Sequence, residues 1–217
     1  RRDARALPRH RRRLLDHGAN YANANYESAN TFTASGHAVL VTGATTAGHG
    51  MVANNWFDRE EGRPVYCVSD PKFPVLGGAG RAGAGFSPAK LLSSTVGDEI
   101  VSRYAPRGRA FALAGKDRSA IIPGGRRGKA FWYSEVTGGF TSSSYYYDVL
   151  PDWVQRWNEP KPALRYRETQ WLPSRAPGEQ RLVGEADNRH ARPEGALGRI
   201  FPHPLVAKSD VLLFSLL

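Results

Sequence analysis

The stretch Ala110-Phe-Ala-Leu-Ala-Gly-Lys-Asp-Arg118 places five apolar residues directly before a glycine and three charged residues. A short apolar run bounded by such a turn is typical of a buried β-strand. Two cations two positions apart on one loop can hold an oxyanion, Lys116 as a point charge and Arg118 through paired hydrogen bonds. The stretch therefore predicts a strand followed by an anion-binding loop. The alternative is a solvated surface turn.

The flanking segments alternate between strand and helix patterns. Residues 96–104 repeat apolar side chains at helical spacing, and two aromatic-rich runs over 130–147 surround a glycine pair, as in a β-hairpin. Residues 37–43 form a short apolar run that suits either a strand or a buried helix. Four further elements are predicted: a strand over 64–68, a glycine-rich loop over 77–85, a helix beginning at Ser87-Pro88, and a short helix over 151–157. Because helices and strands alternate, we predict an α/β fold.

The composition suits a folded globular chain. Of the 217 residues, 41% are hydrophobic, which is too many for a wholly disordered protein. The single cysteine, Cys67, excludes an internal disulfide framework and a cysteine-based zinc ribbon. No apolar run approaches the roughly 18 residues of a membrane-spanning helix, and no signal peptide is visible.

Positive charge is concentrated at the N-terminal end. Residues 1–13 contain seven arginines and one acid, whereas the whole chain has a net charge of +10. A basic arm of this kind can bind a phosphate backbone, and the alternative is a solvated end. Because arginine is frequent throughout the chain and no aromatic residue interleaves the run, we expect no specific nucleic-acid partner.

Two polar residues precede or follow predicted elements in positions suited to an anion. Thr33 lies just before a possible helix, where a hydroxyl sits beside free backbone N–H groups that stabilise negative charge. Its alternative role is a plain helix N-cap. Asn54 carries an amide that can donate a hydrogen bond to a phosphoryl oxygen, and its alternative role is a turn residue.

Taken in order, these segments resemble a known family. Thr31-Phe-Thr-Ala-Ser-Gly-His37, Thr42-Gly43, His49-Gly50 and Asn54-Asn-Trp-Phe-Asp58 resemble the alkaline phosphatase superfamily, in its type I phosphodiesterase/nucleotide pyrophosphatase branch. The nucleophile segment of that branch reads T-x-T-x-P-[GN]-H, and here serine stands where the proline is usual. The likeness runs from about residue 12 to 157, and thinly to 204. It is closest to bacterial alkaline phosphatase-like proteins that carry a Lys-x-Arg pair.

The resemblance implies a zinc-dependent phosphate monoester hydrolase that acts on a small phosphate ester. Thr33 would be the nucleophile, would form a phosphothreonine intermediate and would ligate zinc. Asn54 would donate to a nonbridging phosphoryl oxygen. Lys116 and Arg118 would bind phosphoryl oxygens and favour dianionic monoesters over diesters. Two zinc ions would lower the pKa of the threonine hydroxyl and stabilise the leaving oxygen. The family also implies a periplasmic or secreted location.

The family's other zinc ligands, which are aspartates and histidines in separate segments, have no counterpart here. No ligand motif includes any of the six histidines, His10, His17, His37, His49, His190 and His203. We therefore expect an interior fragment whose central sheet, flanked by helices, is incomplete at both ends and poorly stable alone. Its expected parts are a basic arm (1–13), a partial catalytic domain (14–160) and a loop-rich continuation of that domain (161–217).

Two other functions stay open at this point. One is hydrolysis of phosphodiesters or nucleotide pyrophosphates, which belongs to the same family. The other is non-catalytic binding of an anion or a nucleic acid through residues 1–13 and the Lys116–Arg118 pair.

Overall fold

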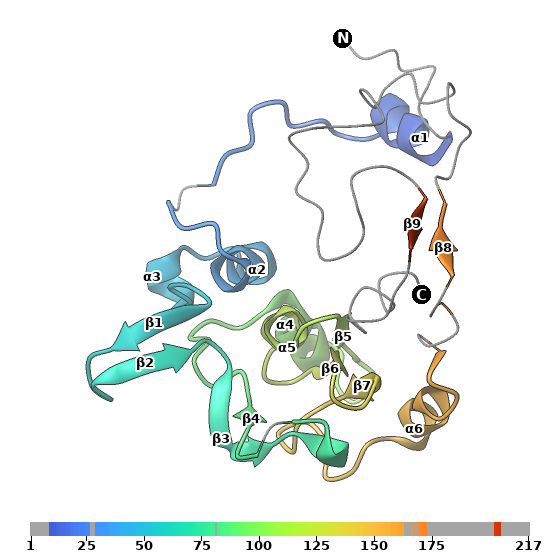
Figure 1. Ribbon diagram of the computed structural model, residues 1–217. Helices are drawn as coiled ribbons and strands as arrows, with labels where there is room; N and C mark the ends of the chain where they lie inside the picture. The colour runs from blue at the N-terminus through green and yellow to red at the C-terminus, as the bar shows by residue number, and fades with distance from the viewer. Residues whose placement is uncertain are drawn as a thin grey trace.

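The computed structural model describes residues 9–26, 29–80, 82–162, 166, 169–172 and 202–204 (Figure 1). Its helices are α1 (Arg9–His17), α2 (Thr33–Thr42), α3 (Thr46–His49), α4 (Val96–Arg103), α5 (Asp117–Gly124) and α6 (Asp152–Asn158), with a 3-10 turn at Leu76–Gly78. Its strands are β1 (Asn55–Asp58), β2 (Arg63–Tyr66), β3 (Ser69–Pro74), β4 (Gly85–Phe86), β5 (Phe111–Ala114), β6 (Lys129–Ser134), β7 (Gly139–Thr141), β8 (Gln170–Trp171) and β9 (His203–Pro204). The predicted α/β class is confirmed.

A three-stranded sheet, ordered β5-β6-β7, lies at the centre of the described part. β5 runs parallel to β6, from the pair Phe111↔Lys129 to the pair Ala114↔Trp132, and α5 connects the two strands. β7 returns antiparallel to β6, so the hairpin predicted over 130–147 is confirmed, although its second strand ends at Thr141. The other sheets are two-stranded antiparallel pairs: β1-β2, β3-β4 and β8-β9.

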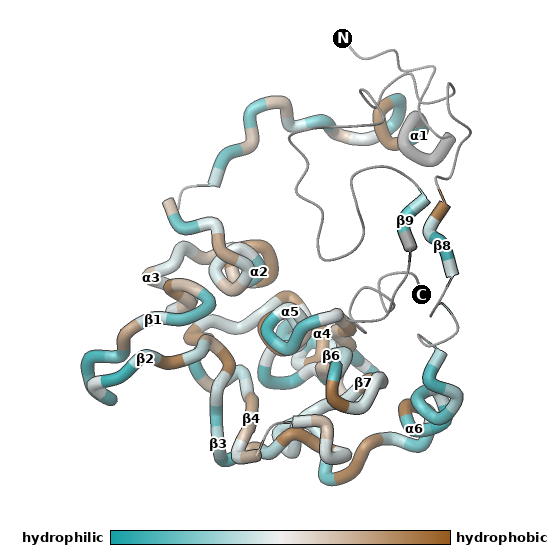
Figure 2. The backbone as a smooth tube through the Cα atoms, viewed as in Figure 1, coloured by the Kyte–Doolittle hydropathy of each residue, from teal (hydrophilic) through white to brown (hydrophobic). Residues whose placement is uncertain are grey.

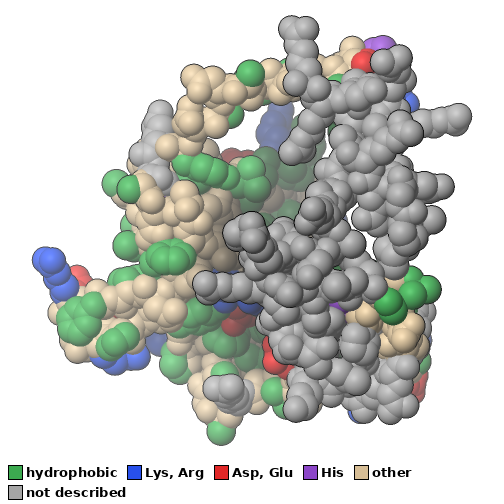
Figure 3. All heavy atoms as spheres, turned by 45° about the horizontal axis from the view of Figure 1, so that its top comes forward, with side chains coloured by type: hydrophobic (Ala, Val, Ile, Leu, Met, Phe, Trp, Pro, Cys, Tyr) green, Lys and Arg blue, Asp and Glu red, His purple; other side chains and the backbone are tan. Residues whose placement is uncertain are grey.

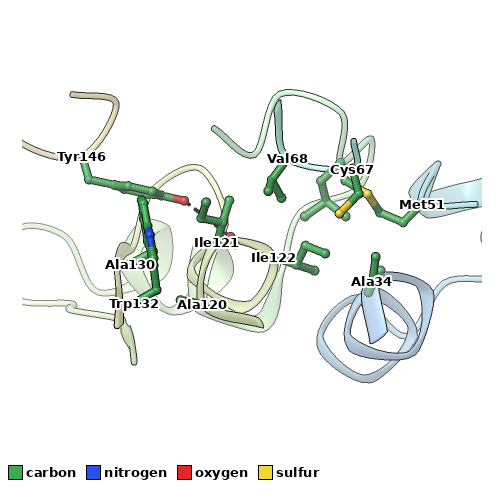
Figure 4. Close-up of a cluster of buried hydrophobic side chains, with 12 residues drawn as sticks. Ala34, Met51, Cys67, Val68, Ala120, Ile121, Ile122, Ala130, Trp132 and Tyr146 are labelled. Atoms are coloured by element: carbon green, nitrogen blue, oxygen red, sulfur yellow. Dashed lines mark hydrogen bonds between the residues drawn. The ribbon is translucent and has the colours of Figure 1, made fainter. Parts of the chain in front are cut away.

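The hydrophobic core forms on both sides of α5. Ile121 and Ile122 of this helix are fully buried. On one side α5 packs against α2, where the small residue Ala34 allows a close approach, and on the other it packs against β6 with Ala130 and Trp132 (Figure 4). This packing fixes the position of the turn that precedes α5 relative to the beginning of α2.

The segment 37–43, which suited either a strand or a helix, belongs to α2 up to residue 42. The helix ends at Thr42, and Gly43 follows as its C-cap with a φ of 66°, which glycine readily adopts. The charged turn after Asp58 joins β1 to β2 and forms the hydrophilic tip of that hairpin (Figure 2). The strand predicted over 64–68 is confirmed in part, because β2 ends at Tyr66.

The helix start predicted at Ser87-Pro88 is wrong. Ser87 Oγ donates to the carboxylate of Asp70 at 2.6 Å and accepts the Ala89 N–H at 3.1 Å, so this hydroxyl stabilises a turn instead. The next helix, α4, begins only at Val96. Its N-cap is Thr95, which forms a capping box with Asp98.

The elements predicted at 96–104 and 110–114 are present, but their apolar side chains do not all point inward. Val96 and Ile100 on α4 and its C-cap residue Tyr104 are exposed, and Phe111 and Leu113 are exposed on β5. Hydrophobic side chains accordingly reach the surface of the described part at several places (Figure 3). None of the described helices is both long and apolar enough to cross a membrane. Residues 1–8 and 173–199, on which parts of the domain predictions depend, lie outside the described residues.

Candidate functional site

Thr33 is the first residue of α2. The N-cap is Phe32, which has an extended backbone and makes no side-chain capping bond. The alternative role of Thr33 as a plain N-cap is therefore excluded. Its side chain is half-buried at the positive end of a ten-residue helix, where backbone N–H groups favour an anion.

Asn54 lies beside this helix start. Its Oδ1 accepts the N–H of Ala34 at 3.0 Å, and its backbone oxygen accepts the N–H of Cys67 at 2.9 Å. Because the side-chain oxygen faces the helix, the amide NH2 is the group that can donate to a ligand next to Thr33. The structure thus brings together two of the four predicted site residues.

The other two, Lys116 and Arg118, lie on the turn from β5 to α5. Lys116 is exposed and is the N-cap residue of α5. Arg118 is half-buried, and its Nη1 donates to the hydroxyl of Tyr66 at 3.1 Å. The Tyr66 hydroxyl in turn donates to Oδ1 of Asp117 at 2.5 Å, and that same oxygen accepts the Arg118 backbone N–H at 2.6 Å.

Tyr66 and Asp117 were missed by sequence reasoning. Burial and the negative charge of Asp117 raise the pKa of Tyr66 well above its usual value, so its hydroxyl stays protonated and keeps its donor role. The two residues are 51 positions apart, and no sequence pattern indicates that they pair. Together they fix the guanidinium of Arg118, which loop geometry alone leaves free to move.

The β1-β2 hairpin connects the two halves of the site. Tyr66 on β2 pairs with Asn55 on β1, the residue that follows Asn54. One end of this pairing therefore touches the beginning of α2 through Asn54, and the other holds Arg118 through Tyr66. Lys116 is positioned through the same turn as Arg118, two residues away.

A cavity of about 400 Å³ opens beside Lys116 and Arg118. It lies at the carboxyl ends of the parallel strands β5 and β6, which is the common ligand position in α/β sheets. Its walls come from three segments: residues 115–118, residues 132–136, and Val75, Ala79, Gly80, Ala84 and Phe86 from the β3-β4 region.

The described residues do not by themselves fit a zinc site. Among them, no group of three or more His, Cys, Asp or Glu side chains is placed to hold a metal ion. His37 contacts the backbone oxygen of Thr33 through Nδ1 at 2.9 Å. His49 is buried and accepts the Met51 N–H through Nδ1 at 3.0 Å, and its burial lowers its pKa. Both imidazoles thus bond to backbone groups close to them in sequence.

Comparison with known proteins shows that the chain is similar to phosphoesterases. The family model described as type I phosphodiesterase / nucleotide pyrophosphatase matches residues 7–192. The alkaline phosphatase PhoV of Synechococcus elongatus is 38% identical over 161 residues, which make up 74% of this chain and 29% of that protein. The alkaline phosphatase PafA of Elizabethkingia meningoseptica is 34% identical over 148 residues, 68% of this chain and 27% of that protein. The matched residues therefore make up less than a third of the length of each of these relatives.

Solved structures agree with the sequence matches. The crystal structure of wild-type PafA superimposes with a TM-score of 0.79 at 31% identity, covering 90% of this chain and 38% of that one. A PafA variant superimposes with a TM-score of 0.74 at 29% identity, covering 84% of this chain and 36% of that one. The variant has a threonine replaced by serine, and an asparagine, a lysine and an arginine each replaced by alanine. Its four positions are separated by 21, 62 and 2 residues.

Proposed function

Since the chain belongs to the type I phosphodiesterase / nucleotide pyrophosphatase family, we propose that it carries the nucleophile and phosphate-binding part of a zinc-dependent phosphate monoesterase. Its relatives PhoV and PafA are alkaline phosphatases, and the proposed activity is that of the whole enzyme they represent. We also propose that this activity lies in the periplasm or outside the cell, as the family resemblance implies, and fractionation of the source cells tests this location.

One observation carries the assignment of the site. Thr33, Asn54, Lys116 and Arg118 are separated by 21, 62 and 2 positions, the same intervals as the four positions substituted in the PafA variant. The residue types also correspond, in the same order. Agreement in both type and spacing supports these four residues as the working set of the site.

In the proposed reaction, the Thr33 oxygen attacks phosphorus, the ester P–O bond breaks, and the organic group leaves with its oxygen. A neutral threonine hydroxyl is a poor nucleophile. It must lose its proton to a base, or bind a metal ion that lowers its pKa. Zinc would supply that activation with the Thr33 oxygen as one of its ligands, and the Asp and His ligands would have to come from residues other than those described. Water then hydrolyses the phosphothreonine and frees inorganic phosphate.

The residues of this chain contribute orientation and charge. The Asn54 amide donates to one nonbridging oxygen, and Lys116 and Arg118 offset the charge on the others. A monoester dianion presents three such oxygens, whereas a diester presents two and adds a second organic group. The paired cations therefore favour monoesters, and relative rates on an aryl monoester and an aryl diester test this preference.

The main experiment measures hydrolysis of an aryl phosphate with added zinc, and phosphothreonine by mass spectrometry, in the whole enzyme of which this chain carries the nucleophile and phosphate-binding part. The Thr33→Ala variant should lose both, whereas the neighbouring and exposed Thr31→Ala variant should keep them. Turnover that survives in Thr33→Ala refutes the nucleophile assignment. Titration with inorganic phosphate tests binding independently: Arg118→Ala should weaken it, whereas the exposed Arg103→Ala should not.

A further inference from the structure

We propose that the cavity beside Lys116 and Arg118 receives the organic group of the phosphate ester and favours an aromatic one. The proposal rests on the proposed function, because it takes the two cations as the phosphate-binding end. Its volume of about 400 Å³ lies within the range of about 300–1,000 Å³ that is usual for small-molecule sites.

The cavity is held open by hydrogen bonds in its walls. Ser134 Oγ donates to the backbone oxygen of Ala79 at 2.7 Å, which ties the end of β6 to the opposite wall. The Val75 N–H donates to the oxygen of Ala84 at 3.2 Å and braces that wall from within. A site fixed in this way binds a ligand without first having to order its own loops.

Aromatic and aliphatic side chains form one part of the lining. The rings of Phe86 and Trp132 meet edge to face, with centroids 5.9 Å apart and planes at 73°. Phe86 also meets the ring of Tyr66 edge to face at 6.1 Å, so an aromatic row runs from the residue that anchors Arg118 to the cavity wall. Val75 and Val136 add aliphatic surface. A guest ring would bury apolar area here and adopt the same edge-to-face geometry.

Another part of the lining is cationic. Residues 115–118 form it, and Arg118 Nε is buried without a hydrogen-bond partner among the described residues. Asp117 lies in the same wall, but its Oδ1 is engaged by Tyr66 and by the Arg118 N–H. The exposed Glu135 is the other acid of the lining, on the turn after β6. A ligand with a dianion at one end and a ring at the other matches this division.

The order of the groups agrees with the reaction. Thr33 and Asn54 are absent from the lining, whereas Lys116 and Arg118 belong to it. In the proposed reaction the two cations hold the phosphoryl group at the boundary between the nucleophile and the cavity. An in-line displacement at phosphorus expels the organic group on the side away from the nucleophile, and the proposal assigns the cavity to that side.

Calorimetry or NMR titration tests the proposal by measuring how tightly the 217-residue chain binds two non-hydrolysable ligands, phenylphosphonate and methylphosphonate. The titrations are made at a pH above the second pKa of both ligands, where both are dianions, so the difference between them reports the organic group. We expect phenylphosphonate to bind about tenfold more tightly because its ring is buried. Val136→Trp, on an exposed cavity position, should abolish this difference by filling the space. Val149→Trp, also exposed but outside the lining, should retain it.

The outcomes separate the inference from the function beneath it. Equal affinities for the two phosphonates, both weakened by Arg118→Ala, would overturn the cavity assignment and leave the phosphate site standing. A preference for phenylphosphonate that persists in Val136→Trp would also overturn it. Binding of neither ligand, or binding that ignores Arg118→Ala, would overturn the proposed phosphate site and with it the inference.

Discussion

The hydroxyl of Tyr66 offers a sharp test of how the phosphate-binding residues are held. The change Tyr66→Phe removes one oxygen and keeps the ring, which still meets Phe86 edge to face. It deletes a hydrogen bond to the Asp117 carboxylate at 2.5 Å and one from the Arg118 guanidinium at 3.1 Å. Asp117 keeps the Arg118 backbone N–H as a donor, but the guanidinium loses its anchor on β2.

Both deleted bonds involve a charged partner, and such bonds contribute about 1.5–3 kcal/mol each when buried. Tyr66 and Arg118 are half-buried, so water can replace part of what is lost. We therefore expect the free energy of unfolding to fall by about 2 kcal/mol in total. The freed guanidinium must also be ordered again on binding, so affinity for inorganic phosphate should fall about five-fold.

Urea unfolding followed by tryptophan fluorescence gives the first quantity, and phosphate titration at a temperature where both proteins are folded gives the second. Tyr104→Phe, on an exposed tyrosine, is the matched control and should change neither. A Tyr66→Phe protein as stable as the parent would refute the energetic reasoning. A less stable protein with unchanged phosphate affinity would refute the positioning role.

Three other changes test separate parts of the structure. Asn54→Asp keeps an acceptor for the Ala34 N–H, so the urea midpoint should stay unchanged. Phosphate affinity should fall at least tenfold, because the carboxylate repels the anion and cannot donate a hydrogen bond. Equal affinity would contradict the donor role of Asn54. Burial raises the pKa of Cys67 to about 12, so the thiol of the unfolded chain ionises at lower pH than that of the folded chain. The free energy of unfolding should therefore fall as the pH rises above about 9, and it should fall less steeply in Cys67→Val. Parallel pH profiles of the two proteins in urea unfolding would contradict this. Thr95→Ala breaks the capping box with Asp98 and should lower the free energy of unfolding by about 1 kcal/mol in the same urea experiment. An unchanged urea midpoint would show that the cap does not stabilise the protein.

Local signals predicted the central sheet well. An apolar run ending in glycine located β5, and aromatic runs around a glycine pair located the β6-β7 hairpin. Helix α5 was not predicted, because Pro123 and Gly124 interrupt its pattern. It forms because burial of Ile121 and Ile122 outweighs those local preferences. The same competition explains the exposed apolar face of α4, whose buried side is Gly97 and the capping residue Asp98.

For the site, the motifs gave residue types but not contacts. The proximity of Lys116 and Arg118 follows from their spacing on one turn, and the structure adds that Asn54 touches the start of α2. The link from Tyr66 to Arg118 joins residues 52 positions apart, and it depends on how a hairpin packs on the α5 turn. No periodicity or composition encodes a contact of that kind.

The β1-β2 hairpin works as a spacer, which constrains how the sequence can vary in length. Its tip, at the exposed residues Arg59 and Glu60, makes no bond to either half of the site among the described residues, so insertions there should be tolerated. Loss of a single residue within β2 is different, since side chains alternate between the two faces of a strand. Such a deletion would turn the Tyr66 ring to the opposite face and separate the threonine end of the site from the arginine end. Variation in length is thus permitted at the tip and forbidden along the strands.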